Sequence, residues 1–424
     1  MKSILLKNVS LSGVHKDILT GGELIKKIGP AGAHVSWDLA GDIEIMDCTG
    51  KAALPGFVNM HTHSPMSMMK GIAEDVLFKD WLGKVWDVEA HFDPEYIYQA
   101  ARVACIEMIR TGTTTFNDQY WSFESIRRAA SEMGIRAAVG YDLMDRFDPE
   151  EAKRQMDKCM QHYEEFKDNA DGHLFVLAFH APYSVSEPLM LWASDFARRN
   201  GIKLHIHLCE TLPEVEDCKK AHGGLTPVEY LDELGILGPE VIAAHTLWLT
   251  PHDVEILGAR RVSCVHNINS NAKLSSGYRF LYNELRDAGA NVCIGTDGCA
   301  SSNNLDMLEA MKTSALFQKA WREDPTALPL DELLDMATVN GARALGLDIG
   351  VIREGASADI DIVDTDNCFF LSPGSFLANL IYSAHSDCID SVISKGRFAM
   401  RGRQIEGEKE ILAQARTFLG VTTV

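Results

Sequence analysis

The sequence predicts an α/β fold, a (β/α)8 TIM-like barrel with a small β-sandwich domain formed by the N- and C-terminal segments. Between residues 54 and 350, short apolar runs that end in polar residues alternate with longer helical patterns. Short alternating runs broken by glycines flank this region on both sides, which is typical of small antiparallel strands. We therefore expect 1–53 and 351–424 to form the two parts of the β-sandwich and 54–350 to form the barrel.

Eight apolar runs are the candidate barrel strands, because eight strand–helix units over roughly 250 residues fit this fold. One helix is expected to begin at Asp93-Pro94, an N-cap followed by proline, and to run to Arg110. Further helices follow Ser186 and cover 305–320. A doubly wound open sheet is the alternative, but no G-x-G-x-x-G follows an early strand. The eight runs are Gly56–His63, Thr113–Asp118, Arg136–Asp142, Leu174–Tyr183, Lys203–Glu210, Val241–Thr246, Arg261–Asn267 and Asn291–Asp297.

Composition and charge exclude several classes of function. The formal net charge of −20 argues against a nucleic-acid or anionic-membrane partner, because phosphates would be repelled. The ten cysteines include no C-x-x-C pair, which indicates reduced thiols and excludes a cysteine-ligated deaminase site. No apolar run is long enough for a signal peptide or a membrane span. We expect a cytoplasmic protein with a small-molecule substrate; the sequence permits a homo-oligomer without requiring one.

Histidines at the ends of the predicted strands indicate a metal site. His61 and His63 end the first strand, and the period of two places them on the same face. Alone, H-x-H would more often mark two partly buried surface histidines. In a barrel, however, the carboxyl ends of all strands meet at the functional face. The later strand ends supply His180, His205, His207, Glu210, His245, His266 and Asp297.

Three imidazoles and one carboxylate complete the shell of one divalent metal and leave a place for water. The predicted metal is Zn²⁺, with Fe²⁺ as the alternative. His207 is preferred to His205 as a ligand because it is closer to the strand end, and His205 is interpreted as a packing or supporting residue. No lysine ends the fourth strand, so a bridged second metal is not expected. The predicted ligands are His61, His63, His207 and Asp297.

Three further groups are suited to hydrolysis at this metal. Glu210 can move a proton between the water and a ring nitrogen of the substrate, although an ordinary helix-start carboxylate is the alternative. Asp297 can hold the metal and accept the first proton from bound water, whose pKa would fall to about 7. His245 can hydrogen-bond the resulting hydroxide. His266 is expected to be a structural residue that holds the 267–271 loop.

These residues resemble those of the amidohydrolase superfamily over essentially the whole chain. The closer resemblance is to the aminohydrolase branch that deaminates 5′-methylthioadenosine and S-adenosylhomocysteine. By this resemblance the metal ligands are the four residues that the spacing favours, and Glu210 and His245 assist the chemistry. The shared motifs are His61-Thr62-His63-Ser64-Pro65-Met66, Gly71-Ile72-Ala73-Glu74-Asp75, His205-Ile206-His207-Leu208-Cys209-Glu210-Thr211, His266-Asn267 with Ser270-Asn271-Ala272-Lys273-Leu274, and Gly295-Thr296-Asp297-Gly298.

The resemblance also implies two substrate-binding residues. Glu89 matches a glutamate that holds the ribose hydroxyls, and His180 matches a histidine that contacts the purine ring. The chain departs from the family at the end of the third strand, where an arginine for the distal part of the substrate is replaced by Tyr141 and Asp142. Arg146 in the next loop is the candidate substitute.

An apolar cluster follows the first strand and permits two interpretations. It comprises Met66–Met69, Phe78, Trp81 and Trp86. A packed loop and helix is the simpler interpretation. The alternative is a soft apolar lid over the adenine and the 5′ substituent.

The predicted activity is metal-dependent hydrolytic deamination of adenosine-type nucleosides, namely 5′-methylthioadenosine, S-adenosylhomocysteine and 5′-deoxyadenosine, which releases ammonia and the inosine analogue. The alternative is an aminohydrolase or chlorohydrolase of another amino-substituted heterocycle, such as guanine, a pterin or a triazine. Glu89 discriminates between them, because a substrate without ribose has no use for it. A non-catalytic barrel would be marked by loss of a ligand or of Glu210, and none is missing.

Overall fold

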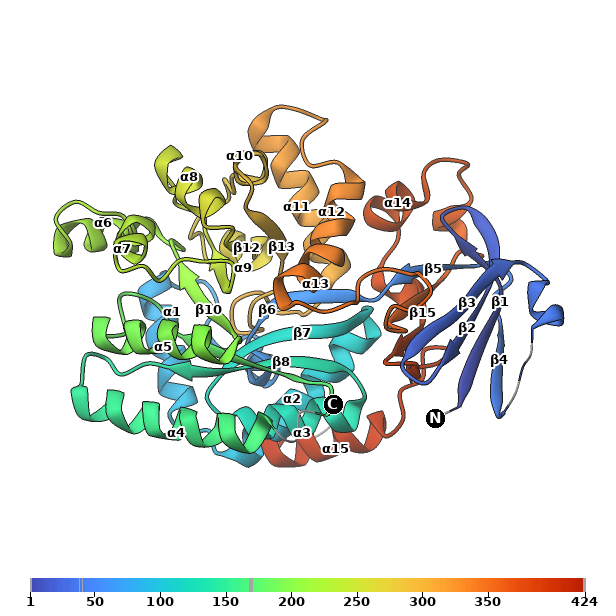
Figure 1. Cartoon of the computed structure of the whole chain (residues 1–424), viewed down its shortest axis with the longest axis horizontal. Coiled ribbons are helices and arrows are strands. Elements are labelled where there is room, and N and C mark those ends of the chain that lie inside the picture. Colours follow the sequence, from blue (N-terminus) through green and yellow to red (C-terminus); the bar gives the residue numbers. More distant parts are fainter. Residues whose placement is uncertain (1, 38, 40, 168–170, 422–424) are drawn as a thin grey trace.

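The computed structural model describes residues 2–37, 39, 41–167 and 171–421. Its larger part is a parallel barrel of strands β6 to β13 in consecutive order, surrounded by helices (Figure 1). Each strand lies within or overlaps one of the eight predicted runs, so the predicted barrel is confirmed. The strands are β6 (Phe57–Thr62), β7 (Thr113–Tyr120), β8 (Arg136–Leu143), β9 (Leu174–Phe179), β10 (Lys203–Leu208), β11 (Val241–His245), β12 (Ser263–His266) and β13 (Asn291–Ile294).

The first and last barrel strands meet through the chain that follows β13. The Asp297 backbone N–H donates to the carbonyl oxygen of His61 over 2.9 Å. Asn59 and Thr296 exchange two hydrogen bonds, of 2.8 and 3.1 Å. A Cβ atom on Gly295 would lie 2.8 Å from the His61 backbone nitrogen, so only glycine permits this approach. Closure of the barrel therefore places His61 beside Asp297.

The helices begin at residues suited to that position. The Asp93 side chain accepts a hydrogen bond of 2.7 Å from the Tyr96 backbone N–H and caps α2 (Pro94–Arg110), as predicted. Three later helices each follow a threonine that forms a capping box with an acidic residue. They are α6 (Leu212–Ala221), α7 (Pro227–Glu233) and α8 (Pro251–Ala259).

Two other predicted helices are confirmed, α5 (Glu187–Asn200) and α11 (Met307–Arg322). No helix in the described part of the chain is long and apolar enough to cross a membrane. The remaining α-helices are α1 (Phe78–Glu89), α3 (Phe123–Met133), α4 (Pro149–Lys167), α9 (Ile268–Lys273), α10 (Tyr282–Ala288), α12 (Leu330–Met336), α13 (Val339–Leu345), α14 (Phe376–Ala378) and α15 (Glu408–Leu419).

The second sheet combines both ends of the chain, at the right of Figure 1. Its strand order is β16-β15-β14-β5-β1-β2-β3, and β4 pairs with β1. Buried side chains of both segments share one apolar core, including Ile4, Ile18, Ile360 and Ile393. The predicted union of the two termini is confirmed, while the boundaries at 53 and 351 stay predictions. The strands are β1 (Ser3–Leu11), β2 (Val14–Gly21), β3 (Leu24–Pro30), β4 (Ile43–Asp47), β5 (Lys51–Pro55), β14 (Ile360–Asp364), β15 (Ile389–Ser394) and β16 (Arg397–Met400).

A buried ion pair joins the barrel to this sheet. Arg136, at the start of β8, lies 3.0 Å from Asp359, and their side chains are 7% and 1% exposed. Arg136 also donates to the hydroxyls of Thr115 and Ser357, over 3.0 and 3.2 Å. Asp359 accepts a further hydrogen bond of 2.9 Å from the Lys395 backbone N–H. Both charges are thus supplied with several partners, which buried charges require.

Asp359→Ala should lower the free energy of unfolding by about 3–5 kcal/mol, because it leaves the Arg136 charge buried without its partner. Urea unfolding followed by circular dichroism measures this loss. Asp217→Ala is the control, since Asp217 and its partner Lys220 are both 74% exposed; its unfolding midpoint should match the wild type. Equal midpoints for the two variants would contradict the importance of the buried pair.

Candidate active site

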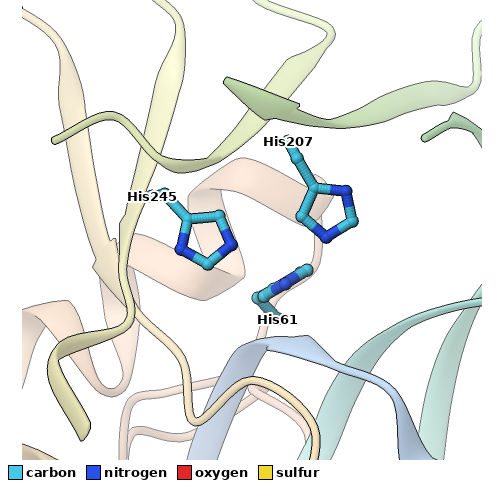
Figure 2. Close-up of side chains that lie close together, drawn as sticks. All are labelled: His61, His207 and His245. Carbon is cyan, nitrogen blue, oxygen red and sulfur yellow. The ribbon is translucent and has the colours of Figure 1, made fainter. Parts of the chain in front are cut away.

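The four predicted metal ligands converge at the carboxyl end of the barrel. The ring centroid of His61 lies 4.9 Å from those of His63 and His207 and 5.4 Å from that of His245. Figure 2 shows the rings of His61, His207 and His245 directed toward a common space. One carboxylate oxygen of Asp297 is 3.3 Å from His61 Nε2 and 3.4 Å from His63 Nε2. Side chains far apart in sequence therefore form one group.

Backbone carbonyls fix the outer nitrogens of two rings. His63 Nδ1 donates to the Gln119 oxygen over 2.7 Å, and His207 Nδ1 donates to the His180 oxygen over 2.8 Å. An imidazole that donates from Nδ1 has its lone pair on Nε2, and these two Nε2 atoms are only 3.3 Å apart. His61 Nε2 is buried and makes no hydrogen bond with the described residues. Three imidazole Nε2 atoms and one carboxylate converge here, and this set of donors fits a divalent cation.

His205 supports His61 from the other side of the ring. His61 Nδ1 lies 3.0 Å from His205 Nε2, and His205 Nδ1 lies 3.0 Å from the side-chain nitrogen of Asn117. That nitrogen also donates to the carbonyl oxygen of Met60 over 3.0 Å. His205 is wholly buried and does not line the cavity. It thus contacts His61, one of the predicted ligands, from outside the cavity.

Asp118 holds the end of the strand that carries His61 and His63. Its carboxylate accepts hydrogen bonds of 2.6 Å from the Thr62 hydroxyl and 2.7 Å from both the backbone N–H and the hydroxyl of Ser64. Because these donors flank His63, Asp118 fixes the backbone on both sides of that ring. Sequence reasoning missed this residue, whose one signal was its position at the end of the second predicted strand.

The electrostatics of the group favour cation binding. Burial lowers the pKa of His61 and holds that of His207 well below its usual value, so both rings are neutral near pH 7. Burial alone would raise the pKa of Asp297, but its contact with His61 and the proximity of His245 and His63 hold it well below its usual value. Asp297 is therefore ionised while these rings are neutral, which is the state that binds a cation.

Glu210 and His245 stand beside this group. Burial, followed by the charges of Asp297 and Glu214, raises the pKa of Glu210 well above its usual value, which favours the protonated form of this carboxyl group. The side-chain nitrogen of Asn271 lies 3.0 Å from His245 Nδ1. An amide nitrogen can only donate, so the His245 proton lies on Nε2, 3.8 Å from Glu210. His245 thus presents an N–H, whereas His63 and His207 present lone pairs.

The cavity next to these groups contains both predicted substrate-binding residues. Glu89 and His180 line it together with Glu210, His245 and Asp297. The Tyr120 hydroxyl donates to Glu89 over 2.6 Å, and burial raises the pKa of Glu89 to about 7. Burial lowers the pKa of His180 to about 3, and its Nδ1 lies 2.7 Å from the Ser184 hydroxyl. His180 is therefore a neutral ring at the cavity wall.

The apolar cluster after the first strand and His266 are the remaining residues for which the sequence predicts a role. Met66, Phe78, Trp81 and Trp86 line the cavity, whereas Met69 is buried in the main core, so the apolar cluster both packs and forms a cavity wall. The His266 ring is structural, as predicted, but it stacks on Phe280 at 4.2 Å and makes no hydrogen bond to 267–271 among the described residues.

Tyr141, Asp142 and Arg146 are the candidates near the end of the third strand for contact with the substrate, and the direction of their side chains decides among them. Tyr141 packs in the main core, and Asp142 lines the cavity. Arg146 does not line the cavity; its guanidinium lies 5.0 Å from the ring centroid of Trp86. Asn271 is a further site residue that sequence reasoning missed, because its contact with His245 depends on how the chain returns after β12.

The chain is similar to known proteins in both sequence and fold. A sequence model described as "Amidohydrolase family" matches residues 52–399. The chain is 42% identical over 419 residues to a 5'-deoxyadenosine deaminase from Methanoregula boonei, covering 98% of this chain and 94% of that protein. It is 40% identical over 415 residues to a 5-methylthioadenosine/S-adenosylhomocysteine deaminase 1 from Archaeoglobus fulgidus, covering 96% of each. The crystal structure of an adenosine deaminase from Xanthomonas campestris with bound zinc matches with a TM-score of 0.91 at 30% identity, covering 99% of this chain and 97% of that one.

We expect the purified protein to hold about one divalent metal ion and His207→Asn to lose most of it, because the substitution removes one of the three imidazole donors. Elemental analysis after dialysis against metal-free buffer measures the metal content. His252→Asn is the control, because that side chain is 62% exposed. Circular dichroism checks that both variants are folded. Wild-type metal content in folded His207→Asn would show that His207 is not a ligand.

Proposed function

The chain belongs to the amidohydrolase family, and from this premise we propose that it hydrolytically deaminates adenosine-type nucleosides. The proposed substrates are 5′-deoxyadenosine, 5′-methylthioadenosine and S-adenosylhomocysteine, and the products are ammonia and the inosine analogue. The names of the relatives from Methanoregula boonei and Archaeoglobus fulgidus support this substrate class. The observation that carries the proposal is the buried carboxyl group of Glu210, 3.8 Å from His245 Nε2, beside a group of side chains that could hold a metal ion.

His61, His63, His207 and Asp297 would hold one divalent cation. Zinc is the first choice, because imidazole nitrogens and a carboxylate suit it and the similar adenosine deaminase contains it. Iron(II) is the second choice with these donors. When bound, the cation supplies an acidified water, whose pKa is about 7 instead of about 15.7.

Three residues would then manage the protons. Glu210 donates its proton to ring nitrogen N1 while the water oxygen attacks C6. The His245 Nε2–H donates a hydrogen bond to the attacking oxygen and stabilises the tetrahedral centre. Asp297, which is ionised, accepts one proton from the attacking water and passes it to the departing amino group, and the second proton of the water returns to Glu210. One water is consumed, one ammonia leaves, and C6 becomes a carbonyl carbon.

Glu89 favours a nucleoside over a free base as the substrate. Its carboxyl group is 9% exposed and lines the cavity, where it accepts one hydrogen bond, from Tyr120. Burial of a carboxyl group is costly, and the two hydroxyls of a ribose would supply it with further donors. The neutral His180 ring would contact the purine. Guanine, a pterin or a triazine would leave Glu89 without a ligand.

Glu210→Gln keeps the size of the side chain but removes the acidic proton. We expect kcat for 5′-deoxyadenosine to fall by about 10²- to 10⁴-fold with the metal content unchanged. Ammonia release measures activity on a panel of adenosine, 5′-deoxyadenosine, 5′-methylthioadenosine, S-adenosylhomocysteine, adenine, guanine and a pterin. Glu216→Gln on α6 is the control. Full activity of metal-loaded Glu210→Gln would refute its role, and wild-type turnover of free bases alone would refute the nucleoside assignment.

The pH dependence of substrate binding should report on Glu89. Burial raises its pKa to about 7, against the opposing contact with Tyr120. Glu89 is therefore protonated below this pH and ionised above it, and the ionised form accepts the stronger hydrogen bonds. The KM for 5′-deoxyadenosine should consequently fall as the pH rises through about 7.

Glu89→Gln should raise KM and remove this pH dependence. Asp87→Asn, an exposed neighbour on α1, is the matched control and should retain it. Steady-state kinetics across this pH range provide the measurement. The same KM profile in Glu89→Gln and the wild type would exclude Glu89 as the group that titrates.

A further inference from the structure

One carboxylate in the cavity has no part in the proposed reaction. Asp142 lies at the end of β8 and lines the cavity together with Glu89 and the metal-binding side chains. Among the described residues it has one hydrogen bond, from the Gln119 side-chain nitrogen to Oδ1 over 2.9 Å. The second carboxylate oxygen is therefore left for a ligand.

Asp142 and the reacting groups lie on different sides of the cavity. Glu210, His245 and Asp297 follow β10, β11 and β13, whereas Gln119 and Asp142 belong to β7 and β8. Glu89 lies on the β7 side as well, because it is bonded to Tyr120 of β7. The charge of Asp142 contributes to the raised pKa of Glu89, which agrees with their proximity. We call the side of the cavity with Glu210, His245 and Asp297 the reaction wall, and the side with Glu89, Gln119 and Asp142 the carboxylate wall.

No lysine or arginine lines this cavity in the described part of the chain. The arginine nearest to the carboxylate wall in sequence, Arg146, is engaged with the Trp86 ring at 5.0 Å. An anion at the carboxylate wall would therefore meet Asp142 and Glu89 with no cationic side chain among the lining residues; Arg146 acts from outside the lining, and its charge contributes to the lowered pKa of His180. Buried like charges without a counter-charge repel strongly.

We propose that Asp142 selects the 5′ substituent of the substrate by its net charge, so that neutral, zwitterionic and cationic substituents are accepted and those with a net negative charge, such as a 5′-phosphate or an isolated 5′-carboxylate, are excluded. This inference rests on the proposed deamination of nucleosides. A nucleoside whose C6 faces Glu210 has its ribose at the far end of the molecule, beside Glu89. The 5′ carbon then lies toward Asp142, whose unpaired oxygen accepts a hydrogen bond from a hydroxyl or an ammonium group.

The test is a series of adenosine analogues that differ in the charge of the 5′ group. It compares 5′-amino-5′-deoxyadenosine, which is a cation at neutral pH, with neutral 5′-deoxyadenosine and the anionic adenosine-5′-carboxylic acid. In the wild type we expect kcat/KM to fall in that order, with the cation favoured over the anion by at least about 100-fold. The difference should lie mainly in KM, because Asp142 takes no part in the proposed proton transfers.

Asp142→Asn keeps the shape of the side chain and should reduce the cation-to-anion ratio by at least about tenfold. Asp157→Asn removes the same formal charge from the exposed face of α4 and should leave the ratio unchanged. The wild-type series tests the inference even if Asp142→Asn does not fold. Equal kcat/KM values across the wild-type series, or an unchanged ratio in folded Asp142→Asn, would overturn it.

The same assay separates this inference from the function on which it rests. Deamination of all three nucleosides without discrimination by charge overturns the role of Asp142 alone. Absence of deamination of every nucleoside by the metal-loaded protein overturns the proposed function together with the inference.

Discussion

The convergence of unprotonated imidazole nitrogens at the end of the barrel is the constraint on which the rest of the structure depends. Nε2 atoms of His63 and His207 that face each other at 3.3 Å are unfavourable without a cation between them. The fold holds them there through carbonyl acceptors on β7 and at the end of β9, supplied by Gln119 and His180. Asp118 adds three hydrogen bonds that fix the chain on either side of His63. The barrel thus maintains the ligand geometry in advance of the metal.

The backbone is strained at the same strand ends. His245 and Asp297, neither of them glycine, have φ angles of 74° and 65°, a conformation that costs about 1–3 kcal/mol per residue. At His245 the chain turns sharply, and the Thr246 backbone N–H donates to the carbonyl oxygen of Leu208 over 2.9 Å. At Asp297 the turn follows Gly295 and lies against β6. These two turns direct a proton donor and a carboxylate into the cavity, so the strain coincides with the reacting groups.

The barrel and the convergence of the four candidate ligands could be predicted from the sequence because both depend on local patterns. An apolar run followed by a polar residue marks the end of a buried strand, and a parallel barrel brings all such ends together. Asp118 and Asn271 escaped prediction because their roles require contacts between distant segments, which no periodicity reveals. The capping boxes of α6, α7 and α8 were, in contrast, readable from the T-x-x-E and T-x-x-D patterns. At Tyr141 and Asp142, alternation along β8 required one side chain to point inward, but the pattern did not say which.

The two walls of the cavity separate the chemistry from the choice of substrate. In the proposed reaction, protons are handled by Glu210, His245 and Asp297, whose pKa values and orientation follow from burial and from the ends of β10, β11 and β13. None of these three groups can distinguish substrates that differ only in the part distant from the reacting amino group. That distinction must come from the opposite wall, where Glu89 and Asp142 stand beside the apolar side chains of α1. None of the predicted metal ligands lies on β8. Substitutions on β8 can therefore change which nucleoside is accepted and leave the candidate metal ligands in place.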